Sequence, residues 1–274
     1  MRINVYIIDG VFIWMVLFEE NTLFSKRDIS KEIKLPATIN LELAEILGVI
    51  LGDGHLECNK KYKSNIVYLL NIAGSYSEDF DYYDTYFRKI FFDLFNADFK
   101  IYLRRNDELV INIYSKIIAN FFKFLGVHPG NKTDFNEIPL IILNSKPEIK
   151  RAFIRDVFDT DGSITFKKDF HEKHSSPVIP ITMKSQKFIE QLSGFMKELG
   201  FTFSSYREEN FDKRVNKISI RHSLDFAGKK NLARYMELIG FSNPRHLTKL
   251  SIFNKKGFYT PRTPYKERKI LLEN

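Results

Sequence analysis

The sequence predicts an α+β protein of two pseudosymmetric repeats, each ordered α-β-β-α-β-β-α and each supplying one four-stranded antiparallel sheet. Three observations carry this prediction. A helix-like segment that ends in Asp-Gly occurs twice, as GVILGDG at 48–54 and as RDVFDTDG at 155–162. The same succession of strand-like and helix-like segments follows each copy. The helix that closes each copy ends in Leu-Gly or Ile-Gly, which is a C-cap signal.

The composition bounds the class of protein. The chain has 274 residues, enough for one large domain or two compact domains. Its 42 Lys and Arg exceed its 34 Asp and Glu, and this net charge of +8 favours a polyanion as the partner. The single cysteine, Cys58, excludes an internal disulfide and a zinc–cysteine cluster, which fits a reducing compartment.

An N-terminal extension, residues 1–40, opens with the apolar segment VYIIDGVFIWMVLF at 5–18. Asp9-Gly10 interrupts this segment, so its apolar runs are too short to span a bilayer. It also lacks the cationic start and the small-residue cleavage site of a signal peptide. Asp-Gly between two β-rich runs predicts a hairpin with a type I′ turn. We therefore expect a soluble protein of the cytoplasm or of an organelle, with no membrane partner.

The first repeat is expected to span residues 41–127. Apolar residues recur at i, i+3 and i+4 in its helices and alternate in its strands. After the first Asp-Gly, the sequence predicts strands at 55–60 and 65–74, a helix at 77–97, strands at 99–107 and 108–115, and a helix at 116–127.

A linker rich in Pro and Asn, residues 128–147, leads to the second repeat at 148–246. After the second Asp-Gly, the sequence predicts strands at 163–170 and 177–185, a helix at 186–200, strands at 201–211 and 214–223, and a helix at 229–241. Residues 247–274 form a basic tail, and we expect this tail to be partly disordered.

The two helices that precede Asp-Gly are expected to pack against each other. Ala44, Gly48 and Gly52 fall at i, i+4 and i+8 and form a stripe of small residues on the first helix, with Asn40 as its N-cap. Gly inside a helix is unfavourable by up to ~1 kcal/mol relative to Ala, and a close helix–helix approach would be a reason to retain it. The counterparts in the second helix are Ala152, Asp156 and Thr160.

Side-by-side packing would bring Asp53 and Asp161 together at the C-terminal ends of these helices. A carboxylate there faces the negative pole of the helix dipole, where Lys or Arg would be favoured. Two carboxylates and two negative helix ends repel strongly, so either one proton is retained or a cation lies between them. Mg²⁺ fits because it prefers hard oxygen ligands. Either Asp-Gly alone would indicate an ordinary turn, but their repetition favours a magnesium site.

The exposed faces of the two sheets are polar and basic, and they would lie side by side below the two acids. In the first repeat these residues are Lys60, Lys61, Lys63, Arg104, Arg105, Asn112 and Tyr114. In the second repeat they are Lys167, Lys168, Lys184, Arg207, Lys213, Arg214, Lys217 and Arg221. A β-ribbon can enter a major groove and contact base edges with such side chains. Acids that hold a metal ion above a duplex predict a phosphodiester hydrolase in which the metal activates water.

These motifs resemble those of the LAGLIDADG homing endonucleases in their single-chain, two-repeat form, of the archaeal or intron-encoded type. ILGVILGDG (46–54) and IRDVFDTDG (154–162) correspond to the two signature helices, and the likeness covers nearly all of residues 40–246. The resemblance implies a monomer with saddle-shaped sheets over double-stranded DNA. It also implies Mg²⁺-dependent cleavage of both strands at a long asymmetric site, leaving 3′ overhangs, with Mn²⁺ or Ca²⁺ able to replace Mg²⁺ in binding.

The resemblance also assigns roles to residues near the two acids. The last acid of each motif, Asp53 or Asp161, would be the catalytic metal ligand. The residue before it, Gly52 or Thr160, would add its backbone carbonyl. The family places Gln or Asn and Lys near the acids to organise water, which assigns a catalytic role to Asn71 in the first repeat.

The second repeat departs from the family pattern in three ways. Pro180 or Ile181 stands where Asn71 has its counterpart, and Lys217 or Arg221 would supply the basic partner. In the second motif helix, Asp156 occupies a position that is usually small. Asp159 has only Leu51 as its counterpart in the first motif helix, so we interpret it as a cap or local hydrogen-bonding group and not as a metal ligand.

An active, nucleoid-associated endonuclease is the first function hypothesis. The alternative is a DNA- or RNA-binding protein on the same scaffold, either an intron maturase whose partner is host intron RNA or a regulator that has lost cleavage. Both acids are retained, which favours cleavage because binding alone gains nothing from two repelling carboxylates. A self-splicing intein is not expected, since the chain begins with Met and ends LLEN without a His-Asn junction.

Overall fold

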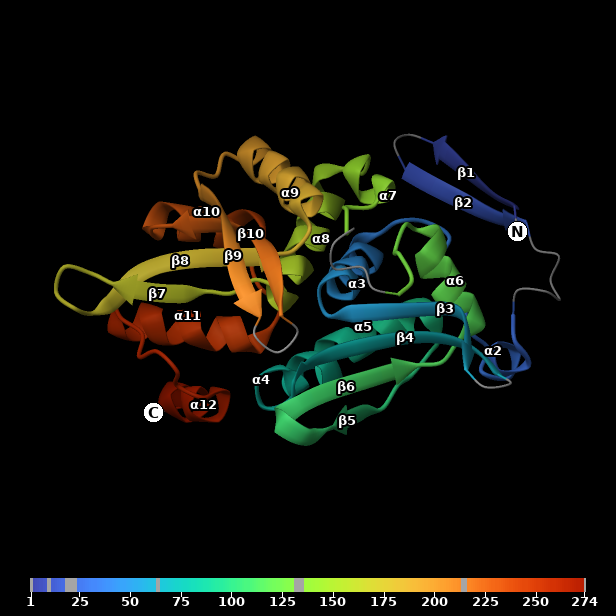
Figure 1. The fold of residues 1–274 in the computed structure, drawn as a ribbon, viewed down its shortest axis with the longest axis horizontal. Coiled ribbons are helices and arrows are strands. Elements are labelled where there is room, and N and C mark those ends of the chain that lie inside the picture. Colours follow the sequence, from blue (N-terminus) through green and yellow to red (C-terminus); the bar gives the residue numbers. More distant parts are fainter. Residues whose placement is uncertain are drawn as a thin grey trace.

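The computed structural model describes residues 2–8, 11–17, 24–62, 65–130, 136–212 and 216–273. Two four-stranded antiparallel sheets lie on either side of two central helices, α3 (Leu41–Gly52) and α8 (Pro147–Thr160) (Figure 1). The predicted fold class, α+β with two repeats packed through the motif helices, is confirmed.

The first repeat has the sheet order β3-β4-β6-β5. After α3 its elements are β3 (Gly54–Tyr62), β4 (Asn65–Ser75), α4 (Tyr76–Asp81), the π-helix η1 (Tyr82–Phe87), α5 (Arg88–Phe95), β5 (Ile101–Leu103), the 3-10 turn η2 (Arg105–Asp107), β6 (Glu108–Ile113) and α6 (Lys116–Phe124). The segment 77–97, predicted as one helix, is thus a helix with a π-helical turn in its middle.

The second repeat has the same order, β7-β8-β10-β9. After α8 its elements are β7 (Thr165–Lys168), β8 (His174–Met183), α9 (Gln186–Glu198), β9 (Ser204–Asp212), β10 (Lys217–Ala227) and α10 (Lys229–Leu238). The register also repeats, because Gly54 pairs with Ile72 in one sheet and Gly162 pairs with Ile181 in the other. The two Asp-Gly segments therefore enter equivalent sheets at equivalent positions.

Helix α3 is buried on all sides because it lies between the two repeats. Every residue from Leu43 to Leu51 is buried, as expected for a helix that is covered around its whole circumference. The Asn40 side chain accepts a hydrogen bond from the Leu43 backbone N–H at 2.9 Å, so the predicted N-cap is present. The sheets contribute the other side of the core through alternating residues such as Leu70 and Ile72 of β4.

The stripe of small residues sets how closely α3 and α8 approach. A Cβ on Gly48 would lie 2.6 Å from the Phe153 carbonyl oxygen, and a Cβ on Gly52 would lie 2.1 Å from Thr160 Oγ1. No carbon atom fits at these distances without movement of the neighbouring helix. The structure therefore shows the close helix–helix contact that we expected from the glycines in this helix.

Gly48→Ala is expected to destabilise the protein by about 1–3 kcal/mol, because the added methyl overpacks the α3–α8 contact. Helix propensity alone would give the opposite sign, since Ala is favoured over Gly by up to ~1 kcal/mol. Gly194→Ala in α9 is the matched control: a Cβ there meets nothing within 4 Å, so this variant should be as stable as the parent or more stable. Urea unfolding of both variants measures the difference, and equal effects would contradict the close contact.

The basic tail is folded, contrary to our expectation of partial disorder. It forms α11 (Pro244–Lys256) and α12 (Tyr265–Glu273), which with the loop between them we call the C-terminal arm, residues 244–273. Asn243 caps α11, and Phe253 stacks on Phe166 of β7 with ring centroids 4.5 Å apart. Buried Arg268 forms an ion pair with Glu78 of α4. The arm therefore contacts both repeats. It is folded because its lysine-rich sequence also contains residues that are buried in these contacts.

The N-terminal extension and the linker contain short elements. β1 (Arg2–Ile8) and β2 (Val11–Leu17) pair as the predicted antiparallel hairpin, and the turn at Asp9-Gly10 lies outside the described residues. α2 (Lys26–Ser30) follows, and α7 (Leu140–Leu143) lies within the linker. In the described parts of the chain, no helix has the length and apolar character needed to cross a bilayer.

Candidate functional site

The two predicted acids end the two central helices. Asp53 is the C-cap of α3, and its N–H donates to the Val49 carbonyl at 2.9 Å; Asp161 is the C-cap of α8, and its N–H donates to Val157 at 3.0 Å. A Cβ on Gly52 would lie 3.3 Å from Asp161 Oδ2. The helices therefore end side by side, and the Asp161 carboxylate lies against the residue that precedes Asp53.

The electrostatics of Asp53 reflect this crowding. Burial and then the neighbouring Asp161 carboxylate raise the pKa of Asp53 from 3.8 to about 7, although Arg245 acts in the opposite direction. The Tyr83 hydroxyl donates to Asp53 Oδ2 at 2.8 Å. Without a cation, the pair therefore tends to retain a proton near neutral pH, which is one of the two outcomes that like charges allow.

The metal-free protein is expected to lose stability as pH rises from about 4 to above 7. The folded pKa of Asp53 lies above its unfolded value, so the folded state binds more protons, and stability falls through this window by up to ~1.4 kcal/mol per pH unit. Asp53→Asn removes this contribution and keeps an oxygen that can accept the Tyr83 hydroxyl. Melting temperatures in EDTA at pH 5 and pH 8 should show Asp53→Asn gaining on the parent at the higher pH. A difference that does not change with pH would contradict this.

Three tyrosines of the π-helical segment reach acids along the helix contact. Tyr82 donates to Asp156, Tyr83 donates to Asp53, and the Tyr86 hydroxyl lies 2.5 Å from a carboxylate oxygen of Glu45. A π-turn inserts an extra residue into a helix and is frequently found at functional sites. Here it directs Tyr82 and Tyr83, which are adjacent in sequence, to acids on different helices.

Asp156 and Asp159 have structural partners. Asp156 is fully buried against α3, where the Tyr82 hydroxyl satisfies one of its oxygens, and burial raises its pKa to about 6. Asp159 Oδ2 accepts the Ser242 backbone N–H at 2.7 Å, just before the C-terminal arm. Asp159 is thus a hydrogen-bonding group, as interpreted from the sequence, but its partner is distant in sequence and not local.

Arg245 of α11 neutralises the end of α8. It donates to the carbonyl oxygens of Asp159 at 2.8 Å and Thr160 at 2.6 Å, and it forms an ion pair with buried Asp79 of α4 at 3.0 Å. A guanidinium therefore occupies the C-terminal pole of α8, where a cation is favoured. The Thr160 carbonyl, assigned to the metal by resemblance, has Arg245 as a hydrogen-bond partner.

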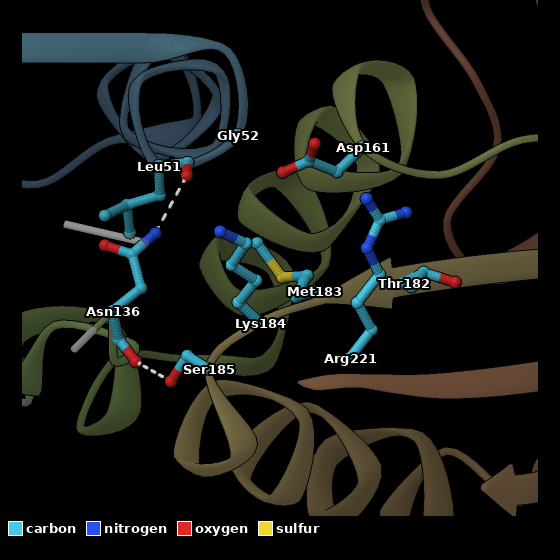
Figure 2. A pocket seen from close by; sticks show the side chains of 9 residues that line it. All are labelled: Leu51, Gly52, Asn136, Asp161, Thr182, Met183, Lys184, Ser185 and Arg221. Carbon is cyan, nitrogen blue, oxygen red and sulfur yellow. Dashed lines mark hydrogen bonds between the residues drawn. The ribbon is translucent and has the colours of Figure 1, made fainter. Parts of the chain in front are cut away.

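A pocket of about 270 Å³ opens beside the acids (Figure 2). It is lined by Leu51, Gly52, Asn136, Asp161, Thr182, Met183, Lys184, Ser185 and Arg221. Figure 2 shows the guanidinium of Arg221 directed toward Asp161, while the Lys184 side chain extends toward the end of α3. The Asn136 amide donates to the Leu51 carbonyl at 3.0 Å and fixes one wall. Two cations thus face a carboxylate across a pocket large enough for a phosphate group.

The position of Asn71 has an equivalent in the second sheet. Asn71 pairs with His55 of β3, and its amide donates to Asn112 Oδ1 at 2.9 Å. In the second sheet the Ser163 N–H donates to the Pro180 carbonyl. Pro180, one of the two candidates, therefore stands opposite Ser163 as Asn71 stands opposite His55, and the second repeat has no side-chain amide at this point.

The predicted basic residues are exposed where the structure describes them. Several are already paired with carboxylates, at Lys60–Glu57, Arg104–Glu108, Lys167–Asp225, Lys168–Glu172 and Arg207–Glu209. Others have no carboxylate partner in the described part of the chain: Lys61, Arg105, Lys184 and Arg221. Tyr114 is 48% exposed. Exposed ion pairs of this kind contribute little to stability, so their Lys and Arg side chains remain available to bind another anion.

Four predicted basic residues cannot be placed by their side chains. Lys63, Lys213 and Arg214 lie outside the described residues. Lys217 begins β10, where its backbone pairs with Asp212, and its side chain is not described. The backbone of Lys217 is four residues along β10 from Arg221, the residue that lines the pocket at the acids.

The donor set fits a hard divalent cation. Asp53 and Asp161 supply carboxylate oxygens, and the ends of α3 and α8 supply carbonyl oxygens beside them. Among the described residues, no group of three or more His, Cys, Asp or Glu is arranged to hold a metal ion. Mg²⁺ characteristically uses one or two carboxylates and takes its remaining ligands from water and substrate phosphates, so two acids are sufficient when a phosphate is present.

Sequence reasoning missed two residues of this site, Tyr83 and Arg245. Both come from segments without a motif, and both reach the acids only through tertiary packing. One signal was available for Arg245, since Asn243-Pro244 is an N-cap followed by Pro at N1, which predicts a helix start.

The fold and the paired acids define a two-repeat protein whose site lies where the repeats meet. Residues 148–240 match the family model of the LAGLIDADG-like domain. The second repeat is therefore a LAGLIDADG-like domain, and the resemblance drawn from the sequence is confirmed.

Two proteins of Methanocaldococcus jannaschii are similar in sequence. A glutamine–fructose-6-phosphate aminotransferase is 24% identical over 239 residues, covering 87% of this chain and 20% of that protein. A replication factor C small subunit is 32% identical over 218 residues, covering 77% of this chain and 10% of that protein. This chain thus matches a fifth or less of each relative, and their own activities do not transfer to it.

Solved structures of the homing endonuclease I-DmoI are similar in fold. A structure of mesophilic I-DmoI variants has a TM-score of 0.51 at 17% identity, over 73% of this chain and 90% of that chain. I-DmoI in complex with DNA and Ca also has a TM-score of 0.51, at 18% identity, over 73% of this chain and 88% of that chain. At this identity the likeness establishes the fold.

Proposed function

We propose that this protein is a site-specific endonuclease that hydrolyses both strands of a DNA duplex with a divalent metal ion, Mg²⁺ in the cell. The observation that carries the proposal is the pair of acids, Asp53 and Asp161, at adjoining helix ends beside a pocket with two cations. Two carboxylates that repel each other at the negative ends of two helices destabilise the folded state, so stability alone does not explain why they are there. The LAGLIDADG-like domain and the I-DmoI fold support this choice.

Asp53 and Asp161 would hold the metal, together with the Gly52 carbonyl and the phosphate of the substrate. The ion would lower the pKa of a bound water and stabilise charge on the leaving oxygen. Tyr83 holds Asp53 in place through the 2.8 Å hydrogen bond. Arg221 and Lys184 bind the phosphate oxygens from the pocket, as cations do at phosphoryl groups. Asn71 and Lys217 stay predictions as water-organising groups.

The two sheets would follow the duplex and select its sequence. Because the two repeats carry different side chains at equivalent positions, the site should be asymmetric. The resemblance to the LAGLIDADG homing endonucleases implies that cleavage leaves 3′ overhangs. One chain contains both repeats, so a monomer suffices. Exposed Arg, Lys and Asn residues on these sheets can contact both phosphates and base edges.

Selection from a randomised duplex library tests the proposal directly. Cleaved molecules recovered in Mg²⁺ or Mn²⁺, and absent in EDTA, would give the activity and the target site together. Binding should also weaken steeply with salt, because phosphate contacts release counterions. No enrichment of cleaved or bound duplex would refute the proposal.

A binding protein on the same scaffold is the second candidate, such as an intron maturase or a regulator without cleavage. One observation favours it: the Thr160 carbonyl, a ligand by resemblance, accepts a hydrogen bond from Arg245 at 2.6 Å. Tight binding of a selected duplex without cleavage in either metal would support this candidate, and preferential binding of intron RNA would identify a maturase.

A further inference from the structure

A second pocket, of about 650 Å³, lies where the C-terminal arm meets both repeats. One wall is the segment that directly follows Asp161, residues 162–166, and another is the start of α4 with Ser75. The arm supplies Arg245, Lys249, Arg262 and Arg268. We call this the arm pocket. It borders the acid pair through Arg245, which contacts the last carbonyls of α8.

The arm pocket carries an excess of positive charge. Arg268 is paired with Glu78 and Arg245 with Asp79. Lys249 and Arg262 have no carboxylate within ion-pair distance and no hydrogen bond among the residues that the structure describes. Burial, followed by Arg268 and Arg245, lowers the pKa of Lys249 to about 8, although the nearby carboxylates of Glu78 and Asp79 act in the opposite direction. A half-buried ammonium beside two guanidinium groups is unfavourable unless an anion joins them.

The backbone at Arg262 is consistent with a built site. Arg262 has φ +63°, in the left-handed region that a non-glycine residue rarely adopts. The surrounding loop therefore holds an arginine in an unfavourable conformation at the rim of a cationic pocket. Such outliers cluster at ligand-binding positions. Ser163 and Thr165 add hydroxyl groups to the same pocket.

The pocket opens at the edge of the basic face of the second sheet. Along β7, Ile164 and Phe166 are buried, whereas Thr165 and Lys167 are exposed. Because side chains alternate between faces along a strand, Thr165 shares its face with Lys167. Lys167 forms its ion pair with Asp225 across that face. An anion in the arm pocket would therefore be continuous with a duplex lying on the sheet.

The two repeats differ in the cation they supply near the acids. Ile72 pairs with Gly54 and Ile181 pairs with Gly162, so these two strand positions are equivalent. Three residues further on, the second repeat has Lys184 and the first repeat has Ser75. Ser75 carries no charge, and its N–H donates to Asp79 Oδ2 at 2.9 Å. The first repeat has to obtain its cation from elsewhere.

We propose that the arm pocket binds a backbone phosphate of the DNA strand opposite the one held by Lys184 and Arg221, with Lys249 and Arg262 as its cations. This rests on the proposed nuclease function and adds a strand-specific phosphate site on a helix outside the two repeats. Lys249 then binds a phosphate of one strand on one side of the acid pair, as Lys184 binds a phosphate of the other strand on the other side.

The test measures the two strands separately. With a selected duplex labelled on each strand in turn, Lys249→Ala should slow cleavage of one strand by about tenfold, and supercoiled plasmid should accumulate as the nicked form. Removal of one phosphate contact should also reduce the slope of log K against log salt by about 1. Lys249→Arg keeps the charge and should retain most of the strand balance. Lys256→Ala, exposed in the last turn of the same helix, is the control and should keep the parental balance.

The outcomes separate this inference from the proposed function. If the parent protein cleaves but Lys249→Ala keeps both the strand ratio and the salt slope, the inference is wrong and the nuclease proposal stands. If the parent neither binds nor cleaves duplex, both are wrong. If inorganic phosphate raises the melting temperature of the parent and not of Lys249→Ala, while DNA cleavage is unaffected, the pocket binds a free anion and the strand assignment is overturned.

Discussion

Asp161→Asn is expected to abolish cleavage of the selected duplex, with a loss of about 10³-fold or more, while binding stays within a few-fold of the parent. Under the proposed function, the substitution removes a charged metal ligand at the scissile phosphate, and a metal ion contributes several kcal/mol to the stabilisation of such a transition state. Binding is expected to persist because it depends on many cations spread over the two sheets, and the neutral amide does not repel phosphate. Asp53→Asn should behave in the same way.

Single-turnover cleavage in Mg²⁺ measures the cleavage rate, and a gel-shift titration in Ca²⁺ measures the affinity for the duplex independently. Asp93→Asn is the matched control, because Asp93 is exposed on α5 and forms a surface ion pair with Lys89; it should cleave at the parental rate. Cleavage by Asp161→Asn within tenfold of the parent would exclude the ligand role. Loss of folding in both acid variants would instead indicate that the acids are structural.

The repeat was predictable from the sequence because it depends on local patterns. Asp-Gly after an apolar helix, alternation in the strands and glycine after the closing helices each report on a few neighbouring residues, and their recurrence fixed the order of the elements. The contact of α3 with α8 followed from Gly48 and Gly52, since residues four apart lie on one side of a helix. The structure has this contact at these two glycines.

The partners of the acids were not predictable in the same way. Tyr83 reaches Asp53 from a π-helical turn. The prediction from hydrophobic periodicity assumed a regular helix with 3.6 residues per turn, so it could not place this side chain. Arg245 lies at the end of the predicted second repeat, directly before residues 247–274, which net charge marked as a partly disordered tail. Its guanidinium is held by Asp79 and by the carbonyls of α8, and this pairing across two repeats is a property of the tertiary structure alone. Charge density therefore predicted disorder where buried ion pairs hold the segment in place.

Arg245→Met is expected to destabilise the protein by about 3–5 kcal/mol, because it leaves the carboxylate of Asp79 buried without its cation. Asp79 is only 1% exposed, and the carbonyls of Asp159 and Thr160 would each lose the hydrogen bond from Arg245 as well. For a chain of this length the loss corresponds to a fall in melting temperature of about 10 °C. Arg207→Met is the control of the same residue type: its pair with Glu209 is exposed, so it should change stability by less than about 1 kcal/mol.

A double-mutant cycle with Asp79→Asn distinguishes the ion pair from the packing of the arginine stem. If the two groups stabilise each other, the double variant should be less destabilised than the sum of the single variants, with a coupling of about 1–3 kcal/mol. Asp79 accepts the Ser75 N–H at 2.9 Å on one carboxylate oxygen and the Asn243 amide at 2.8 Å on the other. Asparagine keeps only one of these acceptors, so Asp79→Asn removes the charge and one acceptor, and the cycle subtracts this cost because it is common to both backgrounds. Additive effects would mean that Arg245 stabilises the protein through the carbonyls of α8 and not through its ion pair with Asp79.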